Sequence, residues 1–240
     1  SFTKIFYTDL GFRKSIDVDF AIKSNDLKAV KGLMIGLKYR EAKANANIEK
    51  KNNRARYLDY PFVKDNPNGQ KFLAEFHIAP AHKALYVPVD FDEWNFSDDK
   101  VFSAVDQAFF VIIHHGAVDL WGKLLHLIDL NQILTTLKNE ELEELLMLCD
   151  RYRVRKFFDL GVKLMTDLFN TKILIDQKYT FRSSMIDKIK MVIVDSKLKG
   201  NWSENTIKVK YHLKMRDSFS DKIKSLASLS RFMLYRKTGF

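Results

Sequence analysis

The hydrophobic periodicity of the chain changes once along its length. Up to about residue 80, short runs alternate apolar and polar residues, as in SIDVDFAI at residues 15–22, which is the period of a half-buried strand. From about Ser97 onward the apolar residues recur at helical spacing almost to the end. With only 9 Gly and 4 Pro among 240 residues, a turn-rich all-β fold is disfavoured. The sequence predicts an α+β protein: a small mixed sheet with flanking helices, followed by a mostly helical C-terminal region.

The first part of the chain predicts a strand, a helix and a hairpin in that order. In the strand, Val18 and Phe20 lie on the side that serves the core, and Asp17 and Asp19 lie on the other. The helix follows in SNDLKAVKGLMIGLKY, where Ser24 or Asn25 can cap it. The hairpin consists of ARYLDYPFVK and QKFLAEFHIA around the turn-forming cluster DNPNG.

The second part predicts helices with a dense apolar core. Residues 103–137 give two helices, with a break near Gly116. Residues 139–169 form a further helical segment with Asn139 as its cap, and amphipathic segments follow at 185–198 and 218–235. The aromatic Trp121 and the small Cys149 are expected to be core residues without a catalytic role.

Charge and cysteine content narrow the environment and the partners. The net charge of +10 comes wholly from residues 171–240, which hold 16 Lys or Arg and 6 Asp or Glu. This excess favours either a polyanionic partner such as nucleic acid or a solvated helical face. Because Cys149 is the only cysteine, no intramolecular disulfide can form, and a cytoplasmic location is expected. The longest apolar run, AFFVII, is too short for a membrane span.

The strongest candidate for chemistry is a set of three carboxylates on strands. Asp17 and Asp19 project from one face of a strand, roughly 6 to 7 Å apart, and would repel each other without a cation between them. In the second arm of the hairpin, Glu75 shares a face with Leu73 and His77. If that arm pairs beside the first strand, Glu75 supplies a third ligand or a proton-accepting base. Oxygen ligands of this kind select Mg²⁺ or Mn²⁺.

Other polar groups offer weaker candidates. Asp90 and Asp92 repeat the carboxylate spacing, but they follow Pro88 in what we interpret as a surface loop. His77 could reach the carboxylates from the face of Glu75. His114 and His115 sit in an apolar helix, and His126 and Asp129 share one face of the next helix. The last two could join a metal site, but a hydrogen-bonded pair that ties two buried helices together is favoured.

Three segments, in order, resemble the uncharacterised nucleotidyltransferase family of the polymerase-β superfamily. GFRKSIDVDFAI with its following helix is similar to that family's R-x-x-[GS]-x-D-[IV]-D strand and helix, although Arg13, Ser15 and Asp17 depart from it by one residue. AEFHIAP resembles a later Glu-Leu-His strand, and FFVIIHHGAVDLWGKLLHLIDLNQIL resembles a helical motif. The resemblance implies a nucleotidyltransferase-like α/β domain at residues 1–95 and a helical domain at 96–240.

The resemblance also implies a reaction. Such a protein would move a nucleoside monophosphate from an NTP to an acceptor hydroxyl on a small molecule, a protein or RNA. Asp17, Asp19 and Glu75 would bind Mg²⁺ or Mn²⁺, and Ser1 and Arg13 would approach the triphosphate. The family's Gly-Ser turn is expected at or just before Ser1. Two alternatives stay open: a degenerate member that binds a nucleotide or a partner without turnover, and a helical protein that binds nucleic acid through its basic last 70 residues.

Overall fold

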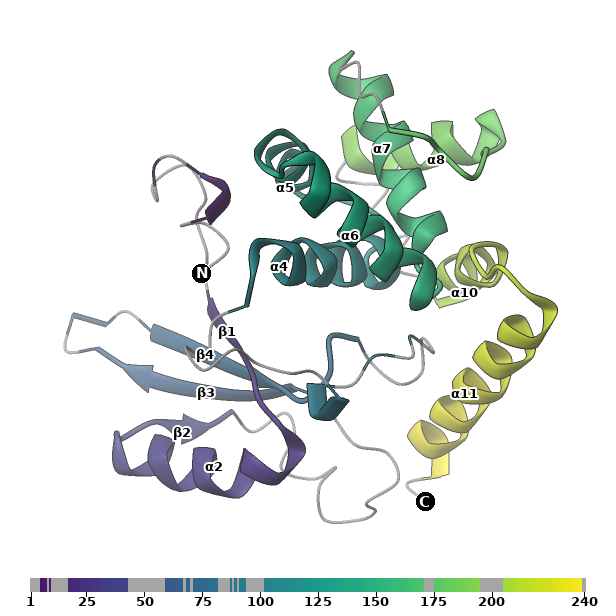
Figure 1. Cartoon of the computed structure of the whole chain (residues 1–240). Helices are drawn as coiled ribbons and strands as arrows, with labels where there is room; N and C mark the ends of the chain where they lie inside the picture. Colours follow the sequence, from purple (N-terminus) through teal and green to yellow (C-terminus); the bar gives the residue numbers. More distant parts are fainter. Residues whose placement is uncertain are drawn as a thin grey trace.

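The chain is an α+β protein, as the sequence predicts. The computed structural model shows a four-stranded mixed sheet with flanking helices and a helical C-terminal region (Figure 1). It describes residues 5–7, 9, 17–42, 59–66, 68–69, 71–81, 87, 89, 91–93, 102–170, 175–194 and 205–238.

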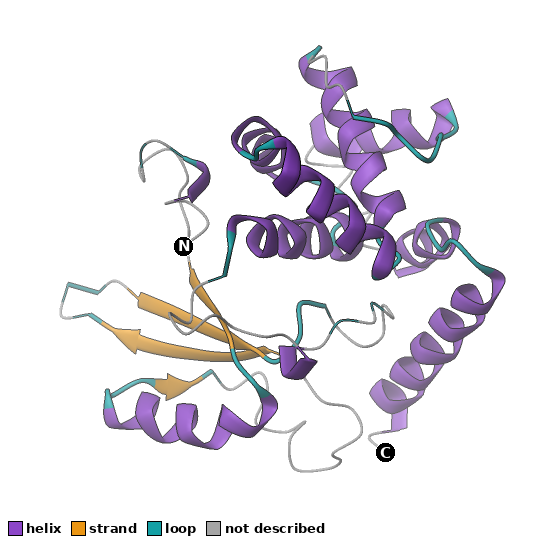
Figure 2. Ribbon diagram, viewed as in Figure 1, coloured by secondary structure: helices purple, strands orange, loops and turns teal. Residues whose placement is uncertain are grey.

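The sheet has the order β1-β4-β3-β2 and is drawn in orange in Figure 2. Its strands are β1 (Asp17–Ala21), β2 (Arg40–Glu41), β3 (Asp59–Asp65) and β4 (Lys71–His77). β3 and β4 form the predicted antiparallel hairpin, and β1 pairs with β4 in parallel. A parallel pair needs a long crossover connection, which here contains the other two strands and a helix.

A helix covers one face of the sheet. After β1 come the 3-10 turn η2 (Ser24–Asp26) and the predicted helix α2 (Leu27–Gly36). Met34 of α2 packs with Phe62 of β3 and with Ala74 and Phe76 of β4. This small cluster therefore lies under the two central strands.

The first strand is less buried than its alternation predicts. Phe20 stacks on Phe76 with ring centroids 4.9 Å apart, yet it is 44% exposed, and Val18 is 57% exposed. The expectation that this whole apolar side serves the core is therefore wrong at Val18. The reason is position, because β1 is an edge strand and α2 packs under its neighbours.

From residue 104 onward, the regular elements of the described residues are helices. They are α4 (Ala104–Val111), the π-helix η5 (Ile112–Val118), α5 (Leu124–Thr136), α6 (Asn139–Arg151), α7 (Arg155–Phe169), α8 (Ser183–Val194), α10 (Asn205–Lys214) and α11 (Phe219–Thr238). A further 3-10 turn, η4 (Phe91–Glu93), precedes them. Across the described residues, no helix combines the length and the apolar character needed to cross a bilayer.

Three local expectations about these helices need correction. The break expected near Gly116 lies after residue 118, because residues 112–118 continue as a π-helix. Asn139 is the first helical residue and not the cap, since the Lys138 N–H precedes it and donates to the Glu141 carboxylate at 2.9 Å. The segment 139–169 is two helices separated at Arg153, which has a left-handed φ of 56°. Helix α10 was not predicted.

Trp121 packs in the centre of the helical core and links its own segment to α7. Its side chain is fully buried, and its Nε1–H donates to the Phe157 carbonyl at 2.7 Å. Leu120 and Trp121 both have left-handed φ values, 52° and 56°, which end the π-helix and turn the indole inward. The predicted core position of Trp121 is confirmed. Cys149 is also fully buried, and burial raises the pKa of its thiol, so the thiol stays protonated.

Gly161 of α7 packs directly against the Trp121 indole, and a substitution there tests this packing. A Cβ at Gly161 would lie 2.6 Å from Trp121 Cε2 and 2.7 Å from Leu130 Cδ2. We expect Gly161→Ala to lower the free energy of unfolding by about 2 kcal/mol through overpacking. The matched control is Gly32→Ala in α2, where nothing lies within 4 Å, and it should stabilise by about 0.5 to 1 kcal/mol. Urea unfolding of both variants measures this, and equal effects would contradict the packing.

Candidate active site

The parallel pairing of β1 with β4 brings together side chains that are far apart in sequence. Asp19 lies opposite Glu75 in the register, and Ala21 lies opposite His77. His77 Nε2 is 3.0 Å from Asp19 Oδ1 and 3.9 Å from Glu75 Oε2. One potential ligand atom from each of Asp19, Glu75 and His77 lies within 4.8 Å of the others. The second arm of the hairpin thus pairs beside the first strand, and this pairing brings Glu75 and His77 next to Asp19. Their roles in a site stay predictions.

The remaining predicted site residues are less well described. Asp17 lies opposite Leu73 in the same ladder, two positions before Asp19, and its side chain is outside the described part of the structure. Ser1 and Arg13 also lie outside the described residues. The ligand role of Asp17 and the triphosphate role of Ser1 and Arg13 stay predictions.

Hydrogen bonding to His77 sets the charge of the Asp19 carboxyl. The contact with His77 holds the pKa of Asp19 below its ordinary value and outweighs the partial burial that raises it. His114 and His115 of the π-helix η5 lower the pKa of Asp19 further, so both imidazoles act electrostatically on this carboxyl. At neutral pH, Asp19 is therefore an ionised carboxylate, which is the form that binds a cation.

The π-helix contributes a second group of ligating side chains. Atoms of His114, His115 and Asp119 also lie within 4.8 Å of one another. Loss of hydration lowers the pKa of His114, and the neighbouring His115 lowers it again, so His114 is neutral near pH 7 and keeps a lone pair. Short π-helices are frequent at functional sites because they displace side chains from the regular helical spacing.

Beneath this group, two histidines and two aspartates tie η5 to α5. His115 Nε2 lies 3.3 Å from Asp129 Oδ2, and His126 Nε2 lies 3.8 Å from Asp119 Oδ2. The two imidazoles stack with centroids 3.9 Å apart. The Tyr7 hydroxyl also donates to Asp129, at 2.5 Å.

The predicted tie between two buried helices is therefore confirmed. His126 and Asp129 project from the same face of α5, and each meets a partner on the facing element: Asp119 for His126 and His115 for Asp129.

The second carboxylate pair of the sequence has a structural use. Asp92 accepts hydrogen bonds from the Ser24 backbone N–H at 2.7 Å and from the Ser24 hydroxyl at 2.6 Å. It thus fastens the turn after β1, and Ser24 serves this contact and makes no side-chain cap for α2. Asp90 lies outside the described residues.

The sequence alone did not reveal that the π-helix borders the carboxylate face. The available signal was the pair His114 and His115 inside an otherwise apolar helix. In a regular α-helix, consecutive side chains point about 100° apart, so His114 and His115 would not be expected to share a site. The wider turn of a π-helix changes these directions, and the sequence does not show that turn.

Asp129 provides a stability test of the buried tie. Its carboxylate is fully buried, accepts a hydrogen bond from the Tyr7 hydroxyl and lies 3.3 Å from His115 Nε2. We expect Asp129→Ala to lower the free energy of unfolding by about 3 kcal/mol, because it removes the shared partner of two partly buried groups. The control Asp187→Ala changes an exposed aspartate of α8 and should stay within about 0.5 kcal/mol of the parent. Urea denaturation compares them, and a neutral Asp129→Ala would refute the tie.

One comparison with known proteins bears on this site. The model of a family described as uncharacterised nucleotidyltransferase matches residues 2–170, which include β1, β4 and the π-helix. No curated protein and no solved structure matches the chain.

Proposed function

The chain belongs to the uncharacterised nucleotidyltransferase family, and on that premise we propose that it moves a nucleoside monophosphate from an NTP to an acceptor hydroxyl. Membership supports a general nucleotidyltransferase activity. The metal, the nucleotide and the acceptor belong to the proposal. The acceptor is a small molecule, a protein or RNA, since a fold does not choose among them. A cytoplasmic location is part of the same proposal.

The observation that carries the proposal is the position of Asp19 opposite Glu75 on adjacent parallel strands. Two carboxylates side by side on one face repel each other unless a cation or a donor compensates them. His77 compensates Asp19 in the absence of a cation. Because two like charges at Asp19 and Glu75 do not stabilise the fold, we expect these carboxylates to serve a chemical function.

The donor set fits a hard divalent cation. We assign Asp17, Asp19 and Glu75 as its holders, with carboxylate oxygens of the type that Mg²⁺ and Mn²⁺ prefer. When bound, the metal stabilises negative charge on the transferring phosphoryl group and on the leaving pyrophosphate. His77 adds a nitrogen that suits Mn²⁺ better than Mg²⁺.

The protein's own groups would orient the reactants and handle the proton. Glu75, 28% exposed, is either the third ligand or the base that accepts the proton of the attacking hydroxyl. Ser1 and Arg13 are proposed to approach the triphosphate. In this scheme residues 1–95 form the catalytic domain, and residues 96–240 form a helical domain whose His114 reaches the reaction site.

Loss of the carboxylates should abolish label transfer. We expect Asp19→Asn or Glu75→Gln to slow transfer of label from an α-labelled NTP by about 100-fold or more, because each removes several kcal/mol of charge stabilisation. The assay incubates the full-length protein with each labelled NTP, Mg²⁺ or Mn²⁺ and cell extract. Asp187→Asn, at an exposed aspartate of α8, is the control and should keep the activity.

The same variants separate the enzyme from a degenerate binding protein. If the parent protein moves no more label than Asp17→Ala/Asp19→Ala, the enzymatic proposal is rejected. The parent protein could instead bind Mn²⁺ but transfer no label, while Asp19→Asn fails to bind Mn²⁺. That result would identify a metal-binding family member without turnover.

A further inference from the structure

A second site lies in the C-terminal helices, away from the carboxylates. A pocket of about 690 Å³ lies among α8, α10, the segment that leads into α8 and the start of α7. Figure 1 shows α8 and α10 on the right of the molecule and the sheet on the left. All its lining residues except Lys156 follow residue 170, where the family match ends. The family's chemistry therefore does not account for this pocket.

The walls of the pocket carry positive charge without matching negative charge. Lys156 is engaged, since it lies 3.3 Å from an Asp217 carboxylate oxygen and donates to the Arg216 carbonyl at 3.0 Å. The other cationic lining residues make no ion pair with a carboxylate within the described part of the chain, and no carboxylate lines the pocket; they are Arg182, Lys188, Lys210 and Lys214. Several uncompensated cations around one concavity raise the local concentration of anions.

The floor of the same pocket is apolar. Met185 and Tyr211 are 8% exposed, Val192 is 6% exposed and Met215 is 1% exposed. Methionine side chains adapt to ligands of different shape. Lys214 Nζ lies over the Tyr211 ring, 5.7 Å from its centroid, so a cation and an aromatic group stand side by side in the pocket. A pocket with cations at its rim and this floor fits a ligand that combines an anionic group with an apolar or planar body.

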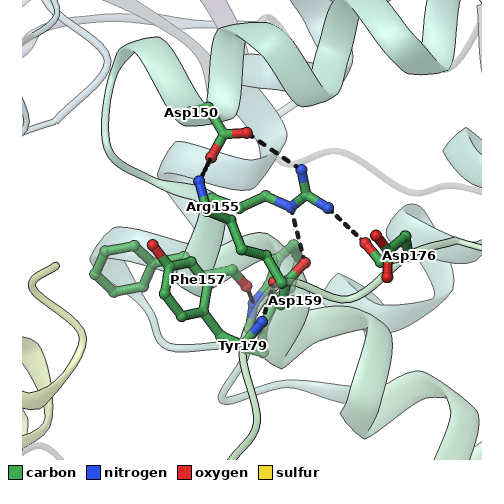
Figure 3. A network of polar contacts seen from close by, with 8 residues as sticks. Asp150, Arg155, Phe157, Asp159, Asp176 and Tyr179 are labelled. Carbon is green, nitrogen blue, oxygen red and sulfur yellow. Dashed lines mark hydrogen bonds and ion pairs between the residues drawn. The ribbon is translucent and has the colours of Figure 1, made fainter.

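A polar network fixes the segment that forms one wall of the pocket, and Figure 3 shows its members. Arg155 is nearly fully buried, bonds to Asp159 at 3.0 Å and donates to the Asp176 carbonyl at 2.6 Å. The Tyr179 N–H donates to the second Asp159 oxygen at 3.0 Å. Lys178 donates to Asp150 at 2.9 Å.

These contacts attach residues 176–179 to α6 and α7. They thereby position the residues that follow directly, including Arg182 at the pocket. Because this segment is already fixed, binding of a ligand loses little conformational entropy in the pocket wall.

We propose that this pocket binds a small organic phosphate. Its phosphate group contacts the cations of α8 and α10, and its apolar body lies on Tyr211 and the methionines. The pocket is a local concavity of about 690 Å³, which favours a small ligand over a nucleic acid, because a nucleic acid needs a continuous basic track with bases stacked along it. The binding site does not depend on the nucleotidyl transfer proposed for the carboxylates.

Calorimetric titration of the full chain with adenosine monophosphate, in EDTA to keep divalent metals away, tests the proposal. We expect binding at least about tenfold tighter than that of inorganic phosphate, because the floor adds apolar contact. Lys188→Glu/Lys210→Glu should weaken adenosine monophosphate binding by about 100-fold, since each lost charged contact is worth about tenfold. Lys28→Glu/Lys222→Glu changes the net charge equally at exposed positions outside the pocket and should bind like the parent.

Further arms make the result decisive. Arg182→Gln is a milder variant that should weaken binding by about tenfold, and circular dichroism verifies that each variant is folded. Arg13→Gln, at the residue proposed to approach the triphosphate, should bind the nucleotide like the parent, and loss of binding there would assign it to the first site instead. Dissociation constants above about 1 mM for the nucleotide would overturn the proposal. So would tighter binding of a single-stranded RNA oligonucleotide through the same residues.

Discussion

The parallel pairing of β1 with β4 is the constraint on which the rest of the structure depends. Asp19 and Glu75 are 56 residues apart in sequence, and this pairing places them side by side on one surface. Parallel pairing cannot be made by a short turn, so the chain must cross over between the two strands. That crossover supplies α2, which buries the apolar side of β3 and β4, and it leaves the carboxylate side open toward the π-helix. The fold and the candidate site thus follow from one choice of strand partner.

Imidazoles compensate the carboxylates that this pairing brings together. His77 contacts Asp19 directly, and the two histidines of η5 act on it from the facing element. A carboxylate held ionised by neighbouring imidazoles can exchange these contacts for a metal cation without a change of fold. The same cannot be said of Asp129, whose partners enclose it completely. Exposure therefore separates the carboxylates suited to chemistry from those that stabilise the core.

Period-two alternation is why the sequence could predict the strand, the hairpin and the shared face of Glu75 and His77. Strand order is not written in that alternation, so the exposure of Val18 at the sheet edge could not be foreseen. The contacts of His115 with Asp129 and of His126 with Asp119 depend on how η5 and α5 face each other, and local sequence spacing does not report this. The π-helix escaped prediction because it arises from a backbone shift and not from a residue pattern.

The charge excess of residues 171–240 left open a choice between a solvated face and an anionic partner. A solvated face would spread its cations over exposed helix surface with carboxylates interspersed, as Lys163, Lys190 and Asp167 do between α7 and α8. Arg182, Lys188, Lys210 and Lys214 instead border one concavity that no carboxylate of the described residues lines. The acids nearby are used elsewhere, since Asp150 and Asp159 bind Arg155 and the segment leading into α8. The acids thus hold the wall in place while these four cations make no ion pair within the described part of the chain, which is the arrangement expected of a site for an anion and not of a surface adapted only to water.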